Sequence, residues 1–359
     1  MLRLETPTPE IPTPTALVDL DTLDRNIERM AARAKTLGVR LRPHVKTHKS
    51  IDIARLQMQQ HSQSTNNGIT VSTIAEAFAF ADAGFRDITW AFPIPLCRVV
   101  QAASLSARLD RFNVVVDHPD AVIALEECAR SLESSFDVFL KIDCGNHRAG
   151  VDPRSEHAIQ LAMRIASSPY LRFRGVLAHG GHAYACTVRE QVERVAEQER
   201  DEAVGFAERL RSAGVMVETV SVGSTPTMSV VASLRGVTEI RPGNYVLYDV
   251  FQATLGMCSF DDIALSVLAT VVGVYPDRNT VVVDAGALAL SLDPGPVRID
   301  RDCGFGVVQV SGSSRLFRVR SLSQEHGVIG VEDRPDVFRI GLRVRILPNH
   351  ACMTAAMFS

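Results

Sequence analysis

The 359-residue sequence has no long apolar run, no dominant charge and few aromatic residues. No stretch approaches the ~18–20 consecutive apolar residues that a membrane-spanning helix needs, so no membrane span is expected. The net charge is −3 at pH 7, which argues against nucleic acid as the main partner. The first 21 residues are acidic and proline-rich without an apolar core, so no secretory signal peptide is predicted.

Paired cysteines are also missing. Seven cysteines are scattered along the chain with no CxxC spacing: Cys97, Cys128, Cys144, Cys186, Cys258, Cys303 and Cys352. An odd, scattered set predicts free thiols in a reducing, cytoplasmic compartment rather than a disulfide framework. The composition, 46% hydrophobic with a mean hydropathy of +0.08, is typical of a soluble globular protein and excludes a largely disordered chain.

What is present between residues 20 and 250 is an alternation of short apolar runs with amphipathic segments. The expected strands are 41–46, 69–73, 87–92, 112–117, 137–143, 173–179, 217–223 and 239–249. Eight strand signals, most of them separated by a helix signal, predict an α/β fold of the (β/α)8 TIM-barrel type. A doubly wound open sheet is the alternative, because periodicity does not reveal whether a sheet closes.

The remaining residues, 251–359, are rich in strand signals and lack long helices. The apolar runs here are 263–275, 279–291, 305–310, 315–323 and 343–347. Turn residues such as those of the PDRN stretch separate them. This pattern predicts a mostly antiparallel β domain after the barrel.

In a barrel, catalytic groups belong at the C-terminal ends of the strands. The first predicted strand ends in PHVKTHKS, which places Lys46 at the mouth. A lysine there can form a Schiff base if partial burial lowers its pKa. A solvated rim lysine is the alternative.

Glycines and hydroxyl residues follow the seventh and eighth predicted strands. The candidates are Gly223, Ser224 and Thr225 in VGSTPT, and Gly243 and Asn244 in RPGNY. Backbone N–H groups at such turns bind phosphate, and barrels often carry a phosphate site there. A lysine facing a phosphate cradle predicts pyridoxal phosphate as the cofactor.

Near the C-terminus, His350 and Cys352 are two residues apart. In an extended chain both side chains point to one face. Imidazole with thiolate suits Zn²⁺, and two protein ligands leave positions open for water and substrate. A buried thiol beside a surface histidine is the alternative.

The sequence resembles the fold-type III pyridoxal-phosphate enzymes, in the branch of D-serine dehydratase and D-threonine aldolase, relatives of alanine racemase. The matching stretches are 13–27, 43–50, 142–153, 178–185, 222–227, 241–249, 283–291 and 348–354. The resemblance implies a barrel over 20–250 and a β domain formed by 1–19 plus 251–359. It also implies a homodimer with sites near the interface, and a further short stretch after Ser359.

The resemblance also implies roles for residues. Lys46 would form the Schiff base, Arg148 would lie near the phenolic oxygen, and His179 and Tyr184 would line the cofactor or substrate side. The phosphate ligands would be Gly223, Ser224, Thr225, Gly243 and Asn244. Arg241 matches the arginine that faces the pyridine nitrogen in racemases, although RPG is also a plain structural turn. His350 and Cys352 would bind a divalent metal, Zn²⁺ with Mn²⁺ or Mg²⁺ as alternatives.

The expected activity is β-elimination from a β-hydroxy D-amino acid such as D-serine, giving a 2-oxo acid and ammonia. Lys46 would remove the Cα proton and the metal would act as a Lewis acid on the β-oxygen. The alternatives are retro-aldol cleavage, as by D-threonine aldolase, and dehydration of D-threo-3-hydroxyaspartate. Cys352 favours dehydration, because an acidic residue is expected at its position in the aldolases. A racemase or a non-enzymatic pyridoxal-phosphate protein fits less well.

Overall fold

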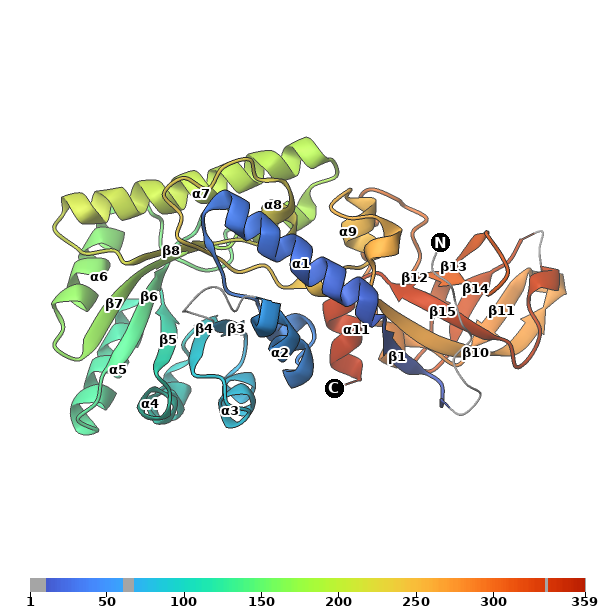
Figure 1. The fold of residues 1–359 in the computed structure, drawn as a ribbon, viewed down its shortest axis with the longest axis horizontal. Coiled ribbons are helices and arrows are strands. Elements are labelled where there is room, and N and C mark those ends of the chain that lie inside the picture. Colours follow the sequence, from blue (N-terminus) through green and yellow to red (C-terminus); the bar gives the residue numbers. More distant parts are fainter. Residues whose placement is uncertain (1–10, 61–67, 333–334, 359) are drawn as a thin grey trace.

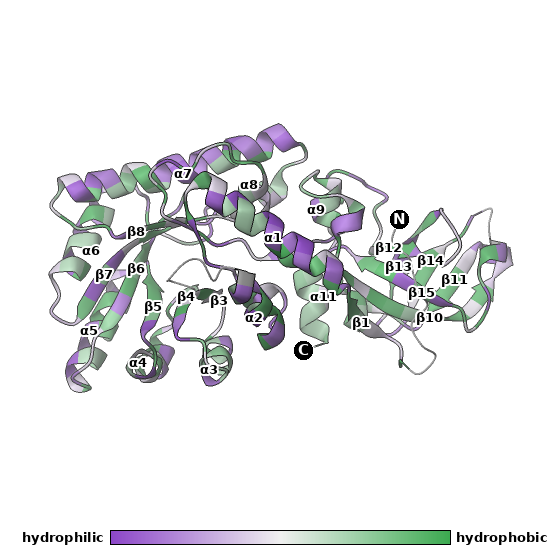
Figure 2. Cartoon of the chain, in the orientation of Figure 1, coloured by the Kyte–Doolittle hydropathy of each residue, from purple (hydrophilic) through white to green (hydrophobic). Residues whose placement is uncertain are grey.

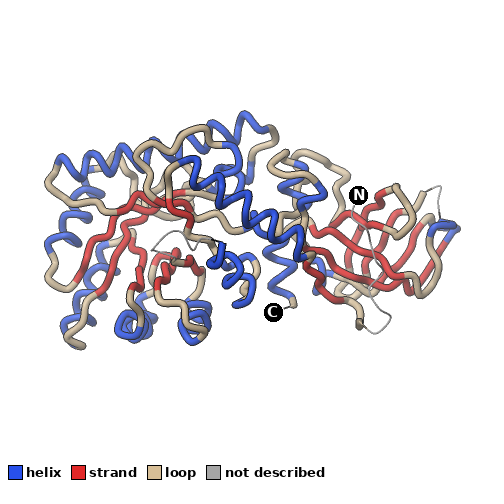
Figure 3. Tube along the Cα trace, in the orientation of Figure 1, coloured by secondary structure: helices blue, strands red, loops and turns tan. Residues whose placement is uncertain are grey.

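The computed structural model describes residues 11–60, 68–332 and 335–358, and shows two bodies joined along one long axis (Figure 1). One body is a parallel sheet ringed by helices and the other is a small antiparallel sheet (Figure 3). Residues 1–10, which fall in the segment predicted to join the β domain, lie outside the described residues. None of the described helices combines the length and the apolar composition needed to cross a bilayer.

The first body contains eight parallel strands. They are β2 (Arg40–Leu41), β3 (Ile69–Val71), β4 (Asp87–Pro93), β5 (Arg111–Val116), β6 (Phe136–Lys141), β7 (Leu171–Leu177), β8 (Thr219–Val222) and β9 (Glu239–Ile240). They pair in the order β2-β9-β8-β7-β6-β5-β4-β3. A parallel bridge between His44 and Thr70, with Thr70 N donating to Pro43 O at 2.8 Å, joins the two end strands. The ring closes, so the predicted barrel is confirmed and the open sheet is wrong.

Helices cover the outside of this ring. They are α1 (Leu20–Leu37), α2 (Ile51–Gln60), α3 (Ile74–Asp82), α4 (Val99–Arg108), α5 (Pro119–Ser131), α6 (Glu156–Ser167), α7 (Arg189–Ser212) and α8 (Thr225–Val230), whereas the short α9 (Val250–Thr254) lies at the junction with the second body (Figure 1). Helix α7 shows why they pack this way. It buries Ala196, Ala203, Phe206 and Leu210 against the barrel and is otherwise largely hydrophilic (Figure 2).

The local chain at the predicted active lysine differs from the expected strand over 41–46. Strand β2 ends at Leu41, and Lys46 lies in a short 3-10 helix, η1 (Val45–Thr47). Pro43 accounts for part of the difference, because it has no N–H to donate to a sheet ladder.

The second body is built from β10 (Leu265–Tyr275), β11 (Thr280–Val283), β12 (Gly306–Gln309), β13 (Leu316–Leu322), β14 (Gly327–Gly330) and β15 (Arg343–Pro348). All pairings are antiparallel, as predicted, and β10 pairs with both β11 and β15, which closes the sheet around an apolar core. Strand β1 (Thr15–Val18) pairs with β10. Two short helices, α10 (Ala287–Leu290) and α11 (Ala351–Met357), complete this part, and α11 packs against η1 of the barrel.

Candidate active site

A cavity of about 390 Å³ lies at the C-terminal ends of the barrel strands. Five predicted site residues line it: Lys46, Arg148, His179, Gly223 and Arg241. The other lining residues are His44, Ser72, Ala91, Phe92, Pro93, Lys141, Ala149 and Leu177. Their position agrees with the rule that barrel enzymes carry their sites at this face.

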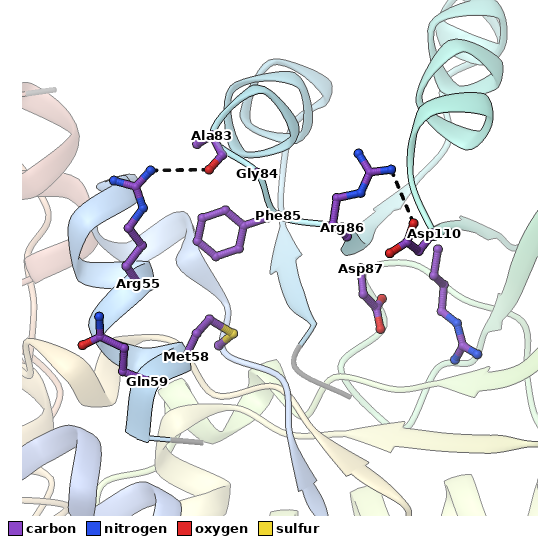
Figure 4. Close-up of a pocket in the computed structure, with 10 residues that line it drawn as sticks. Arg55, Met58, Gln59, Ala83, Gly84, Phe85, Arg86, Asp87 and Asp110 are labelled. Atoms are coloured by element: carbon purple, nitrogen blue, oxygen red, sulfur yellow. Dashed lines mark hydrogen bonds and ion pairs between the residues drawn. The ribbon is translucent and has the colours of Figure 1, made fainter. Parts of the chain in front are cut away.

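A larger cavity of about 650 Å³ lies at the opposite end, where β4 and β5 begin with Asp87 and Arg111. Figure 4 shows its wall, with Arg55 donating to Ala83 O and Arg86 paired with Asp110. None of the predicted site residues lines it.

Lys46 is partly buried at the mouth of the barrel. Burial lowers the pKa of Lys46; the cations of Arg148 and Arg241 lower it further, while Cys352 and Glu76 oppose the shift. A lysine with a lowered pKa keeps more of its amine neutral near pH 7 and is a better nucleophile and base.

His179 follows β7 and is held by the loop after β8. Its Nδ1 lies 3.3 Å from Gly223 O, and because a carbonyl only accepts, Nδ1 carries the hydrogen. Burial, with Lys46 nearby, lowers the pKa of His179 well below its ordinary value. The imidazole is therefore neutral, with Nε2 as an acceptor.

Arg241 is fixed in the cavity wall after β9. Its Nη1 donates to Ser221 Oγ at 2.5 Å and its Nη2 donates to Ala178 O. Burial lowers the pKa of Arg241 to about 10, so the side chain stays a cation at neutral pH. This position supports a functional part for Arg241 beyond a structural turn.

The predicted phosphate ligands divide into two groups. The amides of Gly223 and Ser224 are already engaged: Gly223 N donates to Glu199 Oε1 at 2.8 Å, and Ser224 N donates to Thr227 Oγ1 at 3.0 Å. The amides of Thr225, Gly243 and Asn244 have no acceptor within the described part of the chain.

The two loops with free amides are tied together, because Tyr245 N donates to Thr225 Oγ1 at 3.1 Å. The buried Asn244 Oδ1 also has no partner among the described residues. Gly243 packs so closely that a Cβ would lie 2.7 Å from His44 O, beside the turn that carries Lys46. Converging free amides next to the lysine fit a bound phosphate group.

Tyr184 is not among the residues that line the cavity. It lies in η3 (Gly181–Ala185), is 38% exposed, and stacks on Phe251 with ring centroids 5.6 Å apart. Burial of its hydroxyl, with Cys352 and Asp249 nearby, raises the pKa of Tyr184. Its phenol therefore lies toward Cys352 rather than in the cavity wall.

His350 and Cys352 come together, but not in the extended chain that their spacing suggested. His350 occupies the N-cap position of α11, without a capping hydrogen bond from its side chain, and Cys352 lies in the first turn. Cys352 is near enough to His350 to raise the pKa of the imidazole, and Cys352 Sγ lies 3.3 Å from Thr47 Oγ1, the neighbour of Lys46. Within the described ranges, no group of three or more His, Cys, Asp or Glu side chains is placed to share a metal ion.

Two aspartates that the sequence analysis did not select support this pair. Asp293 Oδ2 accepts from His350 Nδ1 at 2.7 Å. Asp249 is buried and accepts from Ala351 N at 2.9 Å and from Asn244 Nδ2 at 2.6 Å, so it joins α11 to the free amides. The sequence around Asp249 carries the signal of a helix N-cap, because Asp249 accepts a hydrogen bond from Gln252 N three residues later. The sequence around Asp293 carries no such signal.

The barrel, the second β sheet and this site define the class. The alanine racemase N-terminal domain matches residues 18–249 and a serine dehydratase domain matches residues 264–359, so the chain belongs to this family. It is 41% identical to the D-threo-3-hydroxyaspartate dehydratase of Delftia sp. (strain HT23), over 96% of this chain and 92% of that protein. It is 39% identical to a D-serine dehydratase of Dictyostelium discoideum, over 97% of this chain and 92% of that protein.

The solved structure of the Delftia enzyme superimposes with a TM-score of 0.90, at 40% identity over 97% of this chain and 93% of that one. A D-threonine aldolase of Arthrobacter sp is more distant, at 28% identity over 96% of this chain and 86% of that protein. The family resemblance read from the motifs is therefore confirmed.

Proposed function

We propose that this protein eliminates water from a D-amino acid with a β-hydroxyl group, such as D-serine, and thereby yields a 2-oxo acid and ammonia, with pyridoxal phosphate and a divalent metal as cofactors. The observation that carries the proposal is the position of Lys46. It lines a cavity beside the free amides, and its neighbour Thr47 contacts Cys352 of the His350–Cys352 pair.

The residues around the cavity fit pyridoxal phosphate. Lys46 attaches the aldehyde, and the amides of Thr225, Gly243 and Asn244 receive the phosphate. Arg241, Arg148 and His179 line the same cavity, where they would face the pyridine nitrogen, the phenolic oxygen and the ring of the cofactor. When bound, this cofactor delocalises the negative charge left at Cα after proton removal.

His350 and Cys352 fit a divalent ion, and imidazole with thiolate favours Zn²⁺ over Mn²⁺ or Mg²⁺. A solved structure of a D-threo-3-hydroxyaspartate dehydratase, with a cysteine replaced by alanine, is of the metal-free form, which supports a metal site in that relative. The ion supplies a Lewis acid for the β-oxygen.

The chain's own proton chemistry rests on Lys46. With the cofactor bound, the Lys46 amine would be the base that removes the Cα proton of the substrate. The lowered pKa of Lys46 favours the neutral, basic form of the amine. Tyr184, whose phenol lies near Cys352, would contact the substrate from the metal side.

Retro-aldol cleavage is the alternative, supported by the distant D-threonine aldolase. The higher identity to two dehydratases and the cysteine at position 352 favour dehydration. A D-threo-3-hydroxyaspartate dehydratase remains a second candidate within the same reaction class.

The test is product analysis with D-serine and D-threonine, with and without a chelator. We expect pyruvate and 2-oxobutanoate, with turnover lost on metal removal. Glycine and acetaldehyde would overturn dehydration, and full turnover by metal-free protein would reject the role of His350 and Cys352.

Lys46→Ala tests the cofactor assignment directly. We expect it to abolish the visible absorption band of the bound cofactor, because its covalent attachment is lost. Lys35→Ala, on the exposed face of α1, is the matched control and keeps the band. A wild-type band in Lys46→Ala would exclude this lysine.

We also propose a cytoplasmic homodimer. Phe92 at the end of β4, which lines the cavity, and Leu96 and Val100 after that strand are more than half exposed, which supports a partner surface there. Sedimentation should give twice the 39.2 kDa chain mass. A monomer at micromolar concentration would contradict the dimer.

A further inference from the structure

Lysine is rare in this chain. Only four of its 38 Lys and Arg residues are lysines, namely Lys35, Lys46, Lys49 and Lys141. Lys35 is exposed, Lys49 pairs with Glu76, and the other two line the same cavity. Because arginine supplies nearly every other cation, an amine at position 141 indicates a chemical requirement.

Lys141 is the last residue of β6 and is 4% exposed. Its side chain makes no hydrogen bond or ion pair with any residue of the described ranges. In the closed ring, β6 lies four strands from β2 in either direction, so Lys141 faces the cavity from the side opposite Lys46. A buried amine without a partner is costly unless a ligand pairs with it.

The cavity around Lys141 carries an excess of positive charge. Lys46, Lys141, Arg148 and Arg241 line it, and none of the lining residues is Asp or Glu. Burial lowers the pKa of Lys141 to about 8, helped by the neighbouring Arg241 and Arg148, so most of its amine is still protonated at pH 7. Such a wall attracts an anionic oxygen.

We infer that Lys141 binds an anionic oxygen of the ligand on the β6 side of the cavity. The identity of that ligand rests on the proposed function. Two oxygens have this chemistry: the phenolic oxygen of pyridoxal phosphate and a carboxylate of the substrate.

The phenolic oxygen is the better match. In pyridoxal phosphate the phenolic oxygen and the phosphate arm flank the aldehyde carbon on opposite sides. The free amides follow β8 and β9, beside β2, so the phenolic oxygen faces away from them, toward Arg148 and Lys141.

The experiment compares the wild-type holoenzyme with Lys141→Met, Lys141→Arg and the control Lys35→Met. For each we would measure the dissociation constant of pyridoxal phosphate, the visible absorption maximum, and kcat and KM for D-serine. We expect Lys141→Met to weaken cofactor binding tenfold or more and to shift the absorption maximum. Lys141→Arg should recover part of both, and Lys35→Met should change neither.

Two further measurements distinguish the phenolic oxygen of the cofactor from the substrate carboxylate as the partner of Lys141. With 3-deoxypyridoxal phosphate, which lacks the phenolic oxygen, Lys141→Met should bind as well as wild type if that oxygen is the partner. Normal cofactor binding with a tenfold rise in KM for D-serine would assign the substrate carboxylate instead. Wild-type values for affinity, absorption maximum and KM would overturn the inference.

Reductive methylation of the wild-type protein covers the case in which Lys141→Met does not fold. Mass spectrometry should show Lys141 protected when pyridoxal phosphate is present and Lys35 modified in both states. Equal modification of Lys141 would overturn the inference. A wild-type protein without any cofactor band would instead reject the proposed function.

Discussion

Asp293 determines which nitrogen of His350 faces Cys352. Its carboxylate lies 2.7 Å from Nδ1, so the hydrogen sits there and Nε2 is the nitrogen that would bind the proposed metal. Carboxylates of this kind orient histidine ligands and raise their basicity.

We therefore predict that Asp293→Ala lowers zinc affinity by roughly 10–100-fold. Competition with a fluorescent chelator measures it. Asp277→Ala, at an exposed turn, should keep wild-type affinity. Equal zinc affinity in Asp293→Ala and wild type would show that the carboxylate has no such role.

At this scale the sequence predicted residue types better than local conformations. The H-x-C spacing identified His350 and Cys352, yet the pair forms at a helix start, because Ala351 N is held by the distant Asp249. Asp249 and Ala351 are far apart in sequence, and no periodic pattern signals such a contact.

At the scale of elements, Glu199 ties together the loops that follow β7 and β8. The side chain reaches from α7 and is fully buried. Oε1 accepts from Gly180 N at 2.7 Å and from Gly223 N at 2.8 Å, and Oε2 accepts from Thr227 Oγ1 at 3.1 Å. The carboxylate thus holds the N–H of Gly223, the residue whose carbonyl oxygen lies against His179 Nδ1.

We predict that Glu199→Ala lowers the free energy of unfolding by about 2–4 kcal/mol, since two buried amides lose their acceptor. Glu199→Gln keeps an oxygen acceptor and should lose less. Urea denaturation measures both, with the exposed Glu197→Ala as control, expected within about 0.5 kcal/mol of wild type. A Glu199→Ala protein as stable as wild type would show that these hydrogen bonds of Glu199 do not stabilise the fold.

The order of elements was predictable for a physical reason. Each buried parallel strand leaves a continuous apolar run and each covering helix an amphipathic one. Closure of the ring was predicted only from the number of strands. The bridge that closes it joins the single residues His44 and Thr70, and a contact between single residues leaves no pattern in the sequence. The hydrogen bond that occupies the amide of Gly223 was not predictable, since its acceptor, Glu199, lies in α7.

At the scale of the whole molecule, a buried ionic network joins strands on both sides of the barrel seam. Arg42 donates to Glu239 at 2.8 Å and to Asp87 at 2.8 and 3.0 Å, and Glu239 also accepts from Ser221 Oγ at 2.7 Å. Burial opposes ionisation, but Arg42 and Arg40 outweigh it and the pKa of Glu239 is lowered.

A lowered carboxyl pKa gives stability that is present above the ordinary value of 4.5 and is lost as the pH falls through the folded-state value. We predict that Glu239→Gln lowers the free energy of unfolding by about 3 kcal/mol at pH 7, because the buried Arg42 keeps Asp87 but loses one of its two carboxylate partners. The difference in the free energy of unfolding between Glu239→Gln and wild type should become smaller below about pH 4.5, because Glu239 of the wild type then becomes protonated. The midpoints of urea denaturation between pH 7 and pH 4 measure this difference, and Glu208→Gln is the exposed control. Equal midpoints for Glu239→Gln and wild type at pH 7 would contradict the prediction.

The pairing of β1 with β10 has a consequence during synthesis. Thr15 leaves the ribosome early, but its partner Leu268 follows about 250 residues later, on the order of 10–50 s at ~5–20 residues per second. The barrel strands are all made in that interval, while β1 waits as an unpaired strand. The β domain therefore completes its fold only after the barrel has emerged, and the first strand made is among the last to be paired.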